Sequence, residues 1–299
     1  MTRSNTQPAH HRVELGLLGL LACLWGSSYL LISIAVTTIP PLTLIAGRVA
    51  MAACLLLLMM RVRQQRLPRD WPTWQRLFVQ ACCNSIFAWT LLAWGQQYVD
   101  SGLAGVLNST APLLVALAGF ILAGQAAPTP WQVGGVLLGM GGVLLVVGAE
   151  SLYRFDSSLL PQLAVLLSAA LYAGAALHGH RLAHLPPLTV AAGTMVWATL
   201  CLVPLSLLLE QPWTLRPAVP SLLAAAGLGI FCTGIALLLY FRLVVTLGAL
   251  GVASQSYLRA GVSVLLGVIV LGEQLTLPIG LGLGAVIAGV AAINRHSRP

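Results

Sequence analysis

Of the 299 residues of this chain, 58% are hydrophobic and 7% are charged, and the mean hydropathy is +0.91. About a quarter of the residues of a soluble domain are charged because its surface faces water, so this composition excludes an ordinary soluble domain and predicts a lipid bilayer as the solvent. The net charge of +8 comes from arginines in tails and loops, where the anionic membrane surface is the expected partner and nucleic acid is not.

Long apolar runs predict the helices that cross the membrane. A spanning helix needs about 20 mainly apolar residues, and these runs lack the strict alternation of transmembrane barrel strands. The first run follows a polar tail, and short polar connections separate the later ones. We predict an all-α membrane protein with ten spans, at residues 14–36, 41–60, 76–98, 101–122, 131–148, 159–178, 187–208, 218–240, 248–271 and 276–293.

The fifteen basic residues, all of them arginines, predict the orientation of the spans. If both termini are cytoplasmic, eleven arginines fall in the tails and inner connections, and Arg154 and Arg216 fall in outer ones. The remaining two, Arg48 and Arg259, fall within spans. An excess of arginine on the inside is typical of multi-pass proteins. We therefore predict a multi-pass protein of the bacterial cytoplasmic (inner) membrane with both termini cytoplasmic.

The two halves of the sequence resemble each other at a nearly constant offset. Residues 41–43 and 187–189 both read Pro-Leu-Thr, and Gly102 meets Gly248 at the same offset of 146, which becomes 148 further on. Five spans are an odd number, so the second repeat enters the membrane inverted. Inverted repeats are typical of secondary transporters, whose substrate site lies where the repeats meet. The predicted organisation is a cytoplasmic tail at 1–13, a first repeat at 14–148, a linker at 149–158, a second repeat at 159–293 and a cytoplasmic tail at 294–299.

Short motifs occur in order along residues 14–293. They are Trp-Gly-Ser-Ser-Tyr at 25–29, Gly-Arg-Val-Ala at 47–50, Gln-Gln-Tyr-Val-Asp-Ser-Gly-Leu-Ala at 96–104, Ala-Pro-Leu at 111–113 and Leu-Gly-Glu-Gln-Leu-Thr at 271–276. Together they resemble the EamA-type branch of the drug/metabolite transporter superfamily, although this chain has Gly124-Gln125 where that family has Gly-Glu. The resemblance implies ten helices in two inverted five-helix repeats around a central cavity, and export of metabolites. A likeness to the YddG-type exporters implies amino acids as substrates.

Arg259 lies near the middle of the ninth predicted span, and Gln255 lies one helical turn before it. A charge inside the membrane is costly, so each such residue is a functional candidate. Either this pair holds a substrate carboxylate in the cavity, or Arg259 bonds to backbone carbonyls of a neighbouring helix. For Arg48, in the second span, we expect a structural role that ties helices together or reaches an interface.

Polar and aromatic side chains within the spans form a second set of candidates. Rings with polar tips suit amphipathic solutes, although each of them could instead pack helices or lie at the membrane interface. Small residues and a proline at helical spacing indicate close packing or gating. The cavity candidates are Trp25, Ser28, Tyr29, Asn84, Trp94, Asn108, Tyr172, Thr233, Gln255, Tyr257 and Arg259. The structural or gating candidates are Arg48, Gly102, Gly105, Pro112, Gly248 and Gly251.

Together these features predict a secondary transporter or facilitator that exports small organic metabolites, with amino acids as the expected substrates, by alternating access. No Asp or Glu falls at the middle of a span, so we expect downhill transport that does not require a proton gradient. An exporter of drugs or other metabolites is the alternative, and a membrane-embedded lipid-modifying enzyme is an alternative of another class. We expect no enzymatic activity, catalytic residue, cofactor or metal site. The expected partners are a small-molecule substrate and the lipid bilayer, with no obligate protein partner.

Overall fold

The structure is a computed structural model that describes residues 8–111, 113–115, 130–147, 159–240, 242–243, 246 and 255–294. Within these residues every regular element is a helix. The first half contains α1 (Pro8–Ala35), α2 (Pro41–Val62), α3 (Trp71–Ala81), the π-helical turn η1 (Cys82–Ile86), α4 (Phe87–Gly95), α5 (Ser101–Asn108) and α7 (Pro130–Val147).

The second half contains helices of similar length and order. Several helices in both halves begin at a proline, whose fixed φ and missing N–H suit the first helical position. The elements are α9 (Leu159–Gly179), η2 (His180–Leu182), α10 (Pro187–Leu209), η3 (Pro212–Thr214), α11 (Val219–Gly229), η4 (Ile230–Ile235), α13 (Gln255–Leu266), η5 (Gly267–Leu271) and α14 (Leu277–Asn294).

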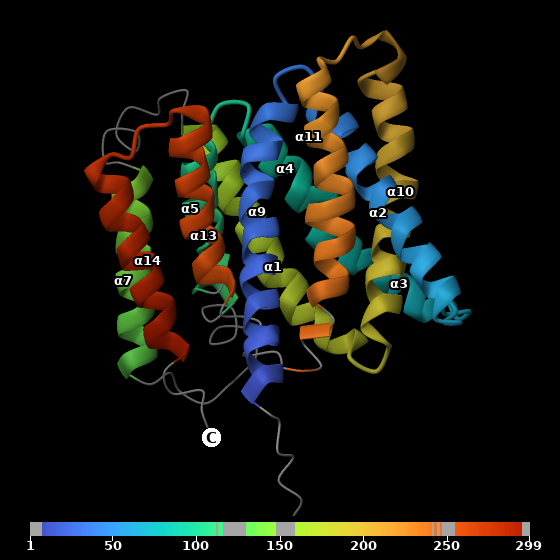
Figure 1. Cartoon of the computed structure of the whole chain (residues 1–299), viewed down its shortest axis with the longest axis horizontal. Helices are drawn as coiled ribbons and strands as arrows, with labels where there is room; N and C mark the ends of the chain where they lie inside the picture. Colours follow the sequence, from blue (N-terminus) through green and yellow to red (C-terminus); the bar gives the residue numbers. More distant parts are fainter. Residues whose placement is uncertain are drawn as a thin grey trace, which may run out of the picture.

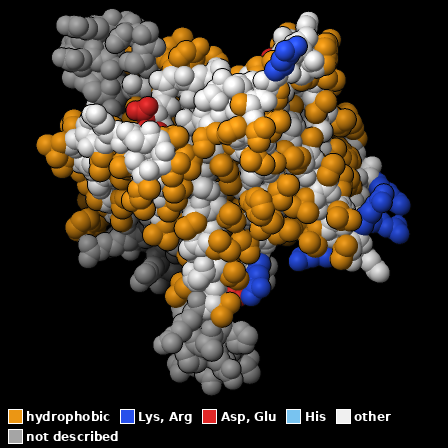
Figure 2. All heavy atoms as spheres, turned by 45° about the horizontal axis from the view of Figure 1, so that its top comes forward, with side chains coloured by type: hydrophobic (Ala, Val, Ile, Leu, Met, Phe, Trp, Pro, Cys, Tyr) orange, Lys and Arg blue, Asp and Glu red, His pale blue; other side chains and the backbone are white. Residues whose placement is uncertain are grey.

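Among the described residues, six helical segments are long and apolar enough to cross a membrane: Val13–Ala35, Pro41–Val62, Trp71–Gly95, Leu159–Leu182, Pro187–Leu209 and Val219–Tyr240. Four shorter apolar helices accompany them, at Ser101–Val115, Val133–Gly142, Leu258–Leu271 and Leu277–Gly289. Figure 2 shows a broad apolar surface with Arg, Asp and Glu side chains toward its edges. Exposed leucines such as Leu208 (75%) and Leu223 (68%) belong to these helices and suit contact with lipid tails. These features confirm the prediction of an all-helical, multi-pass membrane protein.

Helices from the two halves pack against each other. The most extensive contacts join α7 to α14, at one end of the molecule in Figure 1, and α2 to α10, toward the other end. Between these pairs, α13 packs against α1 and α5, and α9 packs against α4 and α5. Because segments distant in sequence lie side by side, the centre of the bundle combines side chains from both halves.

The connections define two sides of the molecule. In Figure 1, α1 ends and α14 begins on the upper side, where α10 is also joined to α11. The lower side holds the beginning of α1 and the end of α14. We use "upper side" and "lower side" in this sense throughout.

Three π-helical turns lie among the described residues: η5 follows α13, and η1 and η4 interrupt helices at nearly corresponding positions in the two halves. η1 begins at residue 82 and η4 at residue 230, a separation of 148 that exceeds by two residues the offset of 146 relating the surrounding sequence. A π turn adds a residue to a helical turn and is frequent at functional sites. Here both turns face the interior: Ser85 of η1 and Cys232 and Thr233 of η4 are buried.

Candidate functional site in the polar centre of the bundle

Arg259 of α13 bonds to Asn108, which is itself bonded to Tyr29, and both of these side chains belong to the first half of the chain. Its Nη2 donates a hydrogen bond to Asn108 Oδ1 at 3.3 Å, and Tyr29 Oη donates to the same oxygen at 2.9 Å. Asn108, at the end of α5, and Tyr29, in α1, are 1% and 2% exposed, whereas Arg259 is half-buried. A guanidinium has donors and no acceptor, so this bond orients Asn108 with its oxygen toward Arg259.

Asn108 also has hydrogen-bonding capacity that the protein does not use. Its Nδ2 is buried and has no protein hydrogen-bond partner. Buried polar groups are nearly always paired, and a carboxylate accepts bidentate bonds from planar donors. Spare donors on Asn108 beside the Arg259 guanidinium therefore suit a carboxylate ligand.

Arg48 of α2 is the second cation of the bundle interior, and it is only 5% exposed. Its Nε donates to Thr233 Oγ1 at 2.8 Å, and its guanidinium carbon lies 3.9 Å from the centre of the Trp89 ring. Thr233 lies in the π turn η4 and in turn donates to the carbonyl oxygen of Leu228 at 2.8 Å. The turn thus presents a hydroxyl that accepts from the arginine, and Trp89 of α4 provides a cation–π surface.

Two tyrosines connect the surroundings of these arginines. Tyr29 interacts electrostatically with both Arg259 and Arg48. Tyr172, a half-buried residue of α9, interacts with both arginines, with Tyr29 and with the side chain of Trp89. Seven elements therefore bring these residues together. We call the group of Tyr29, Arg48, Trp89, Asn108, Tyr172, Thr233 and Arg259 the polar centre.

The polar centre lacks a carboxylate. The salt bridge found among the described residues joins Arg242 to Glu14 at 2.8 Å, away from the centre at the lower end of α1. The seven acidic residues of the whole sequence are Glu14, Asp70, Asp100, Glu150, Asp156, Glu210 and Glu273, and all lie near the ends of predicted spans or outside them. The positive charge of the polar centre is therefore not balanced by an acid of this chain within the predicted membrane interior.

Other cavity candidates either pack apart from this network or form hydrogen bonds with residues close to them in the sequence. The ring of Trp25 packs 5.6 Å from that of Tyr240, and the ring of Trp94 packs 5.7 Å from that of Tyr98. Ser28 Oγ donates to the Trp25 carbonyl oxygen of its own helix at 2.6 Å. Asn84, in η1, donates to the neighbouring Ser85 hydroxyl at 3.1 Å. Pro112, Gly248, Gly251 and the side chains of Gln255 and Tyr257 lie outside the described residues.

Gly102 and Gly105 allow α5 to pack closely on α13. A Cβ at Gly105 would overlap the side chain of Ser263, and one at Gly102 would lie 3.3 Å from the Val264 Cα. The close approach places Asn108 beside Arg259, one helical turn further along α5. The described geometry of both glycines is thus that of helix packing.

Two carboxylates of the second half hold helix N-termini of the first half on the upper side. Glu273 accepts hydrogen bonds from the Ser101 N–H at 2.7 Å and the Gly102 N–H at 2.9 Å, at the start of α5. Glu210 accepts from the N–H groups at the start of α2, those of Leu42 at 3.1 Å and Thr43 at 2.6 Å. We call these two interactions the carboxylate clamps. They satisfy N–H groups that have no partner within the helix, and they place negative charge at the positive end of the helix dipole.

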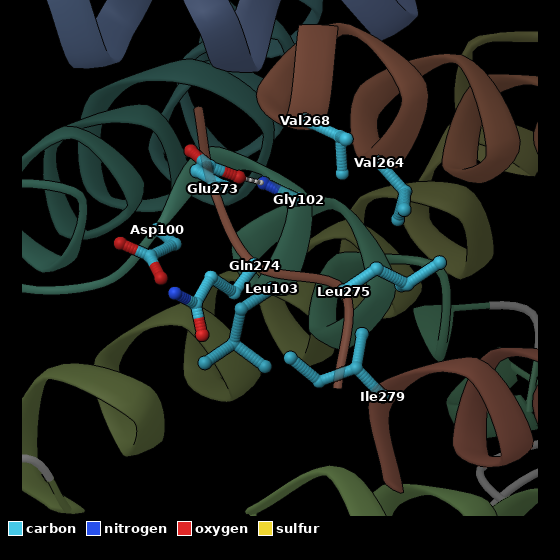
Figure 3. A pocket seen from close by; sticks show the side chains of 9 residues that line it. All are labelled: Asp100, Gly102, Leu103, Val264, Val268, Glu273, Gln274, Leu275 and Ile279. Carbon is cyan, nitrogen blue, oxygen red and sulfur yellow. Dashed lines mark hydrogen bonds between the residues drawn. The ribbon is translucent and has the colours of Figure 1, made fainter. Parts of the chain in front are cut away.

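A small pocket lies beside the Glu273 clamp, lined by Asp100, Gly102, Leu103, Val264, Val268, Glu273, Gln274, Leu275 and Ile279. Figure 3 shows the Glu273 carboxylate bonded to the Gly102 N–H, with Asp100 nearby. Burial, together with the neighbouring Glu273 carboxylate, raises the pKa of Asp100 above its ordinary value. The pocket is distinct from the polar centre and contains no cation that would favour an anionic ligand.

Sequence reasoning missed two parts of this arrangement. Gln96 was not among the candidates, yet its Nε2 donates to the Tyr29 carbonyl oxygen at 2.9 Å. Glu210 and Glu273 are helix-end residues whose partners lie more than 160 positions away. Such contacts depend on the fold. A local signal did exist for Gln96, because a polar amide at a span end is costly unless it is hydrogen-bonded.

Comparison with known proteins identifies the family. The family model of the EamA-like transporter family matches residues 15–148 and again residues 159–295. The chain belongs to the EamA-like transporter family. It is 30% identical to Protein PagO of Salmonella typhimurium over 241 residues, which cover 78% of this chain and 77% of PagO.

More distant members match over nearly their whole length. The chain is 25% identical to the "Uncharacterized inner membrane transporter YedA" of Escherichia coli K12, covering 93% of this chain and 90% of YedA. It is also 25% identical to the "Uncharacterized transporter YvbV" of Bacillus subtilis, covering 94% and 92% of the two chains. The crystal structure of another protein has the same fold, with a TM-score of 0.65 and 23% sequence identity. The match covers 92% of this chain and 94% of the other. The family resemblance inferred from the motifs is therefore confirmed, and with it a general role in membrane transport.

Proposed function

We propose that this protein is a secondary transporter or facilitator that exports small organic metabolites bearing a carboxylate, amino acids among them, by alternating access. Arg259 and Asn108 form the contact for the carboxylate, and Tyr29 holds Asn108 in place. The observation that carries this proposal is the bond between Arg259 and Asn108, which leaves the buried Nδ2 of Asn108 without a protein partner in a bundle of a transporter family.

The proposed architecture is ten spans in two inverted five-helix repeats, at residues 14–148 and 159–293. Contacts between helices that correspond in the two repeats support it, because a two-fold axis brings such helices together: α2 packs on α10, α5 on α13 and α7 on α14. The family model also matches each half separately. The π turns η1 and η4, which lie within two residues of corresponding positions, add support that does not depend on sequence similarity.

The proposed location is the bacterial inner membrane, with the lower side and both termini cytoplasmic. The arginine distribution supports this orientation, because the connection at residues 61–76 carries Arg61, Arg63, Arg66, Arg69 and Arg76 on the lower side. The description of YedA as an inner membrane transporter supports the location.

Transport by the purified protein in liposomes tests the function. The purified protein is reconstituted into liposomes that are loaded with unlabelled carboxylate solutes. Counterflow of radiolabelled alanine, phenylalanine, lactate and 3-phenyllactate into these liposomes is then measured. Arg259→Gln should reduce uptake of every transported solute at least about tenfold, since a charge-assisted bond contributes about 1.5–3 kcal/mol. Arg61→Gln removes an exposed arginine at the end of α2 and is the matched control. Uptake by Arg259→Gln equal to that of the control would rule out Arg259 as the carboxylate contact.

A further inference from the structure

Two guanidinium groups without a carboxylate give the polar centre a net positive charge. Arg259 and Tyr29 donate to the same oxygen of Asn108, and the charges of both Arg48 and Arg259 act on Tyr29 and Tyr172. Every acidic residue of the sequence lies near the end of a predicted span or outside the spans. Arginine stays protonated in proteins, and the charge is therefore permanent.

We infer that the transported solute carries a net negative charge and that the membrane potential drives its export. The inference rests on the proposed function, because Arg259 and Asn108 provide the contact for the carboxylate. Arg48 does not need to touch the solute. It is occupied by Thr233 and Trp89, but its charge acts through space where the dielectric constant is low.

A zwitterionic amino acid fits this environment less well than an anion of the same shape. Its carboxylate gains the same contact with Arg259, but its ammonium group is repelled by both guanidinium groups. An unpartnered acceptor near Tyr29 is Oε1 of Gln96, which is neutral and cannot balance an ammonium charge. Like charges brought together in a binding site lower affinity, so hydroxy acids, keto acids and acidic amino acids are favoured over neutral amino acids.

The same charge allows export without a proton relay. The interior of a bacterial cell is electrically negative, so the potential drives an anion outward. Each 100 mV supports about a 50-fold concentration ratio of a monovalent anion. A facilitator that carries the anion alone therefore needs no intramembrane Asp or Glu, and the sequence has none at the middle of a span.

Matched pairs of solutes test the charge requirement. Lactate and alanine, and 3-phenyllactate and phenylalanine, differ in a hydroxyl or an ammonium group on the same carbon. Uptake into proteoliposomes is measured with radiolabelled solutes at zero potential and at a potassium diffusion potential set by valinomycin, with protein-free vesicles as the blank. We expect the hydroxy acid of each transported pair to enter at least about tenfold faster than the amino acid, since tenfold corresponds to about 1.4 kcal/mol. We also expect an interior-positive potential of 100 mV to accumulate it about 50-fold.

Two variants separate the charge of Arg48 from its packing. Arg48→Gln should lower the preference for the hydroxy acid about tenfold, whereas Arg48→Lys keeps the charge and should retain it. Arg61→Gln should leave the preference unchanged. Equal entry of both members of a pair into vesicles with the unmodified protein, or hydroxy-acid uptake that ignores the potential, would overturn the inference while leaving transport intact. Failure of both members of both pairs to enter would instead refute the proposed function together with the inference.

Discussion

Glu273 and Asp100 are neighbouring acids, and we expect their neutralisation to change the stability of the protein in opposite directions. Glu273→Gln keeps one carbonyl oxygen for the start of α5 but presents an NH₂ group to the second N–H, which lies 2.7 or 2.9 Å from the present carboxylate oxygens. The variant therefore loses one charge-assisted hydrogen bond and weakens the other. We expect it to be less stable than the unmodified protein.

The size of the effect follows from the geometry. A hydrogen bond to a charged group contributes about 1.5–3 kcal/mol, and a neutral one about 0.5–1.5 kcal/mol. The lost interaction with the helix dipole adds about 0.5 kcal/mol. Because Glu273 is half-buried and partly screened by solvent, we expect a total loss of about 2 kcal/mol. This corresponds to an apparent melting temperature about 4–8 °C lower, using the values for large domains.

Asp100→Asn is the matched control, because it removes the same charge from the same pocket without removing a helix cap. The raised pKa of Asp100 means that its ionised form is disfavoured in the folded state. Its ionisation therefore costs stability as the pH rises from below its unfolded pKa to above its folded pKa. In thermal unfolding in detergent at pH 7, Asp100→Asn should melt higher than the unmodified protein and Glu273→Gln lower. A Glu273→Gln variant as stable as the unmodified protein would refute the assignment of the clamp.

Three further predictions concern the pH dependence at Asp100, the partner of Arg48, and the orientation in the membrane. The stabilisation by Asp100→Asn should disappear in melting curves recorded below about pH 4, where an ordinary aspartate is protonated in the unfolded chain. Thr233→Val should lower stability by about 1–3 kcal/mol by leaving Arg48 Nε buried without its acceptor, whereas Thr233→Ser should retain it; equal melting temperatures for both would contradict this. Single cysteines placed in residues 61–75 of a cysteine-free variant should react with an impermeant maleimide only after the cells are opened, and labelling of intact cells would reverse the proposed orientation.

The apolar runs predicted the membrane location and the helical class because they depend on local composition. Residues 41–62 and 187–209 each hold enough consecutive apolar residues to span the bilayer, and both form helices. The family could be recognised for a similar reason, since its motifs are short and ordered. The π turns η1 and η4 could not be predicted, because a π turn changes the helical register without a distinctive local residue pattern.

The polar centre was predictable in part. Arg259, Tyr29 and Asn108 attracted attention as polar groups in apolar surroundings, and the hydrogen bonds join these three. The expected structural tie of Arg48 stays a prediction, although the bond to Thr233 fits it. The sequence could not predict that the charges of both arginines act on Tyr29, because this depends on how α2 and α13 are placed around α1.

The two partners of each carboxylate clamp are synthesised at different times. Both clamped helices, α2 and α5, belong to the first half, and both carboxylates, Glu210 and Glu273, belong to the second. During synthesis the starts of these helices therefore emerge from the ribosome well before their caps exist. Until then, water, lipid headgroups or the insertion machinery must satisfy the free N–H groups. A fragment that ends at residue 148 would lack both caps permanently, and co-expression of residues 149–299 should be needed to protect it from membrane proteases.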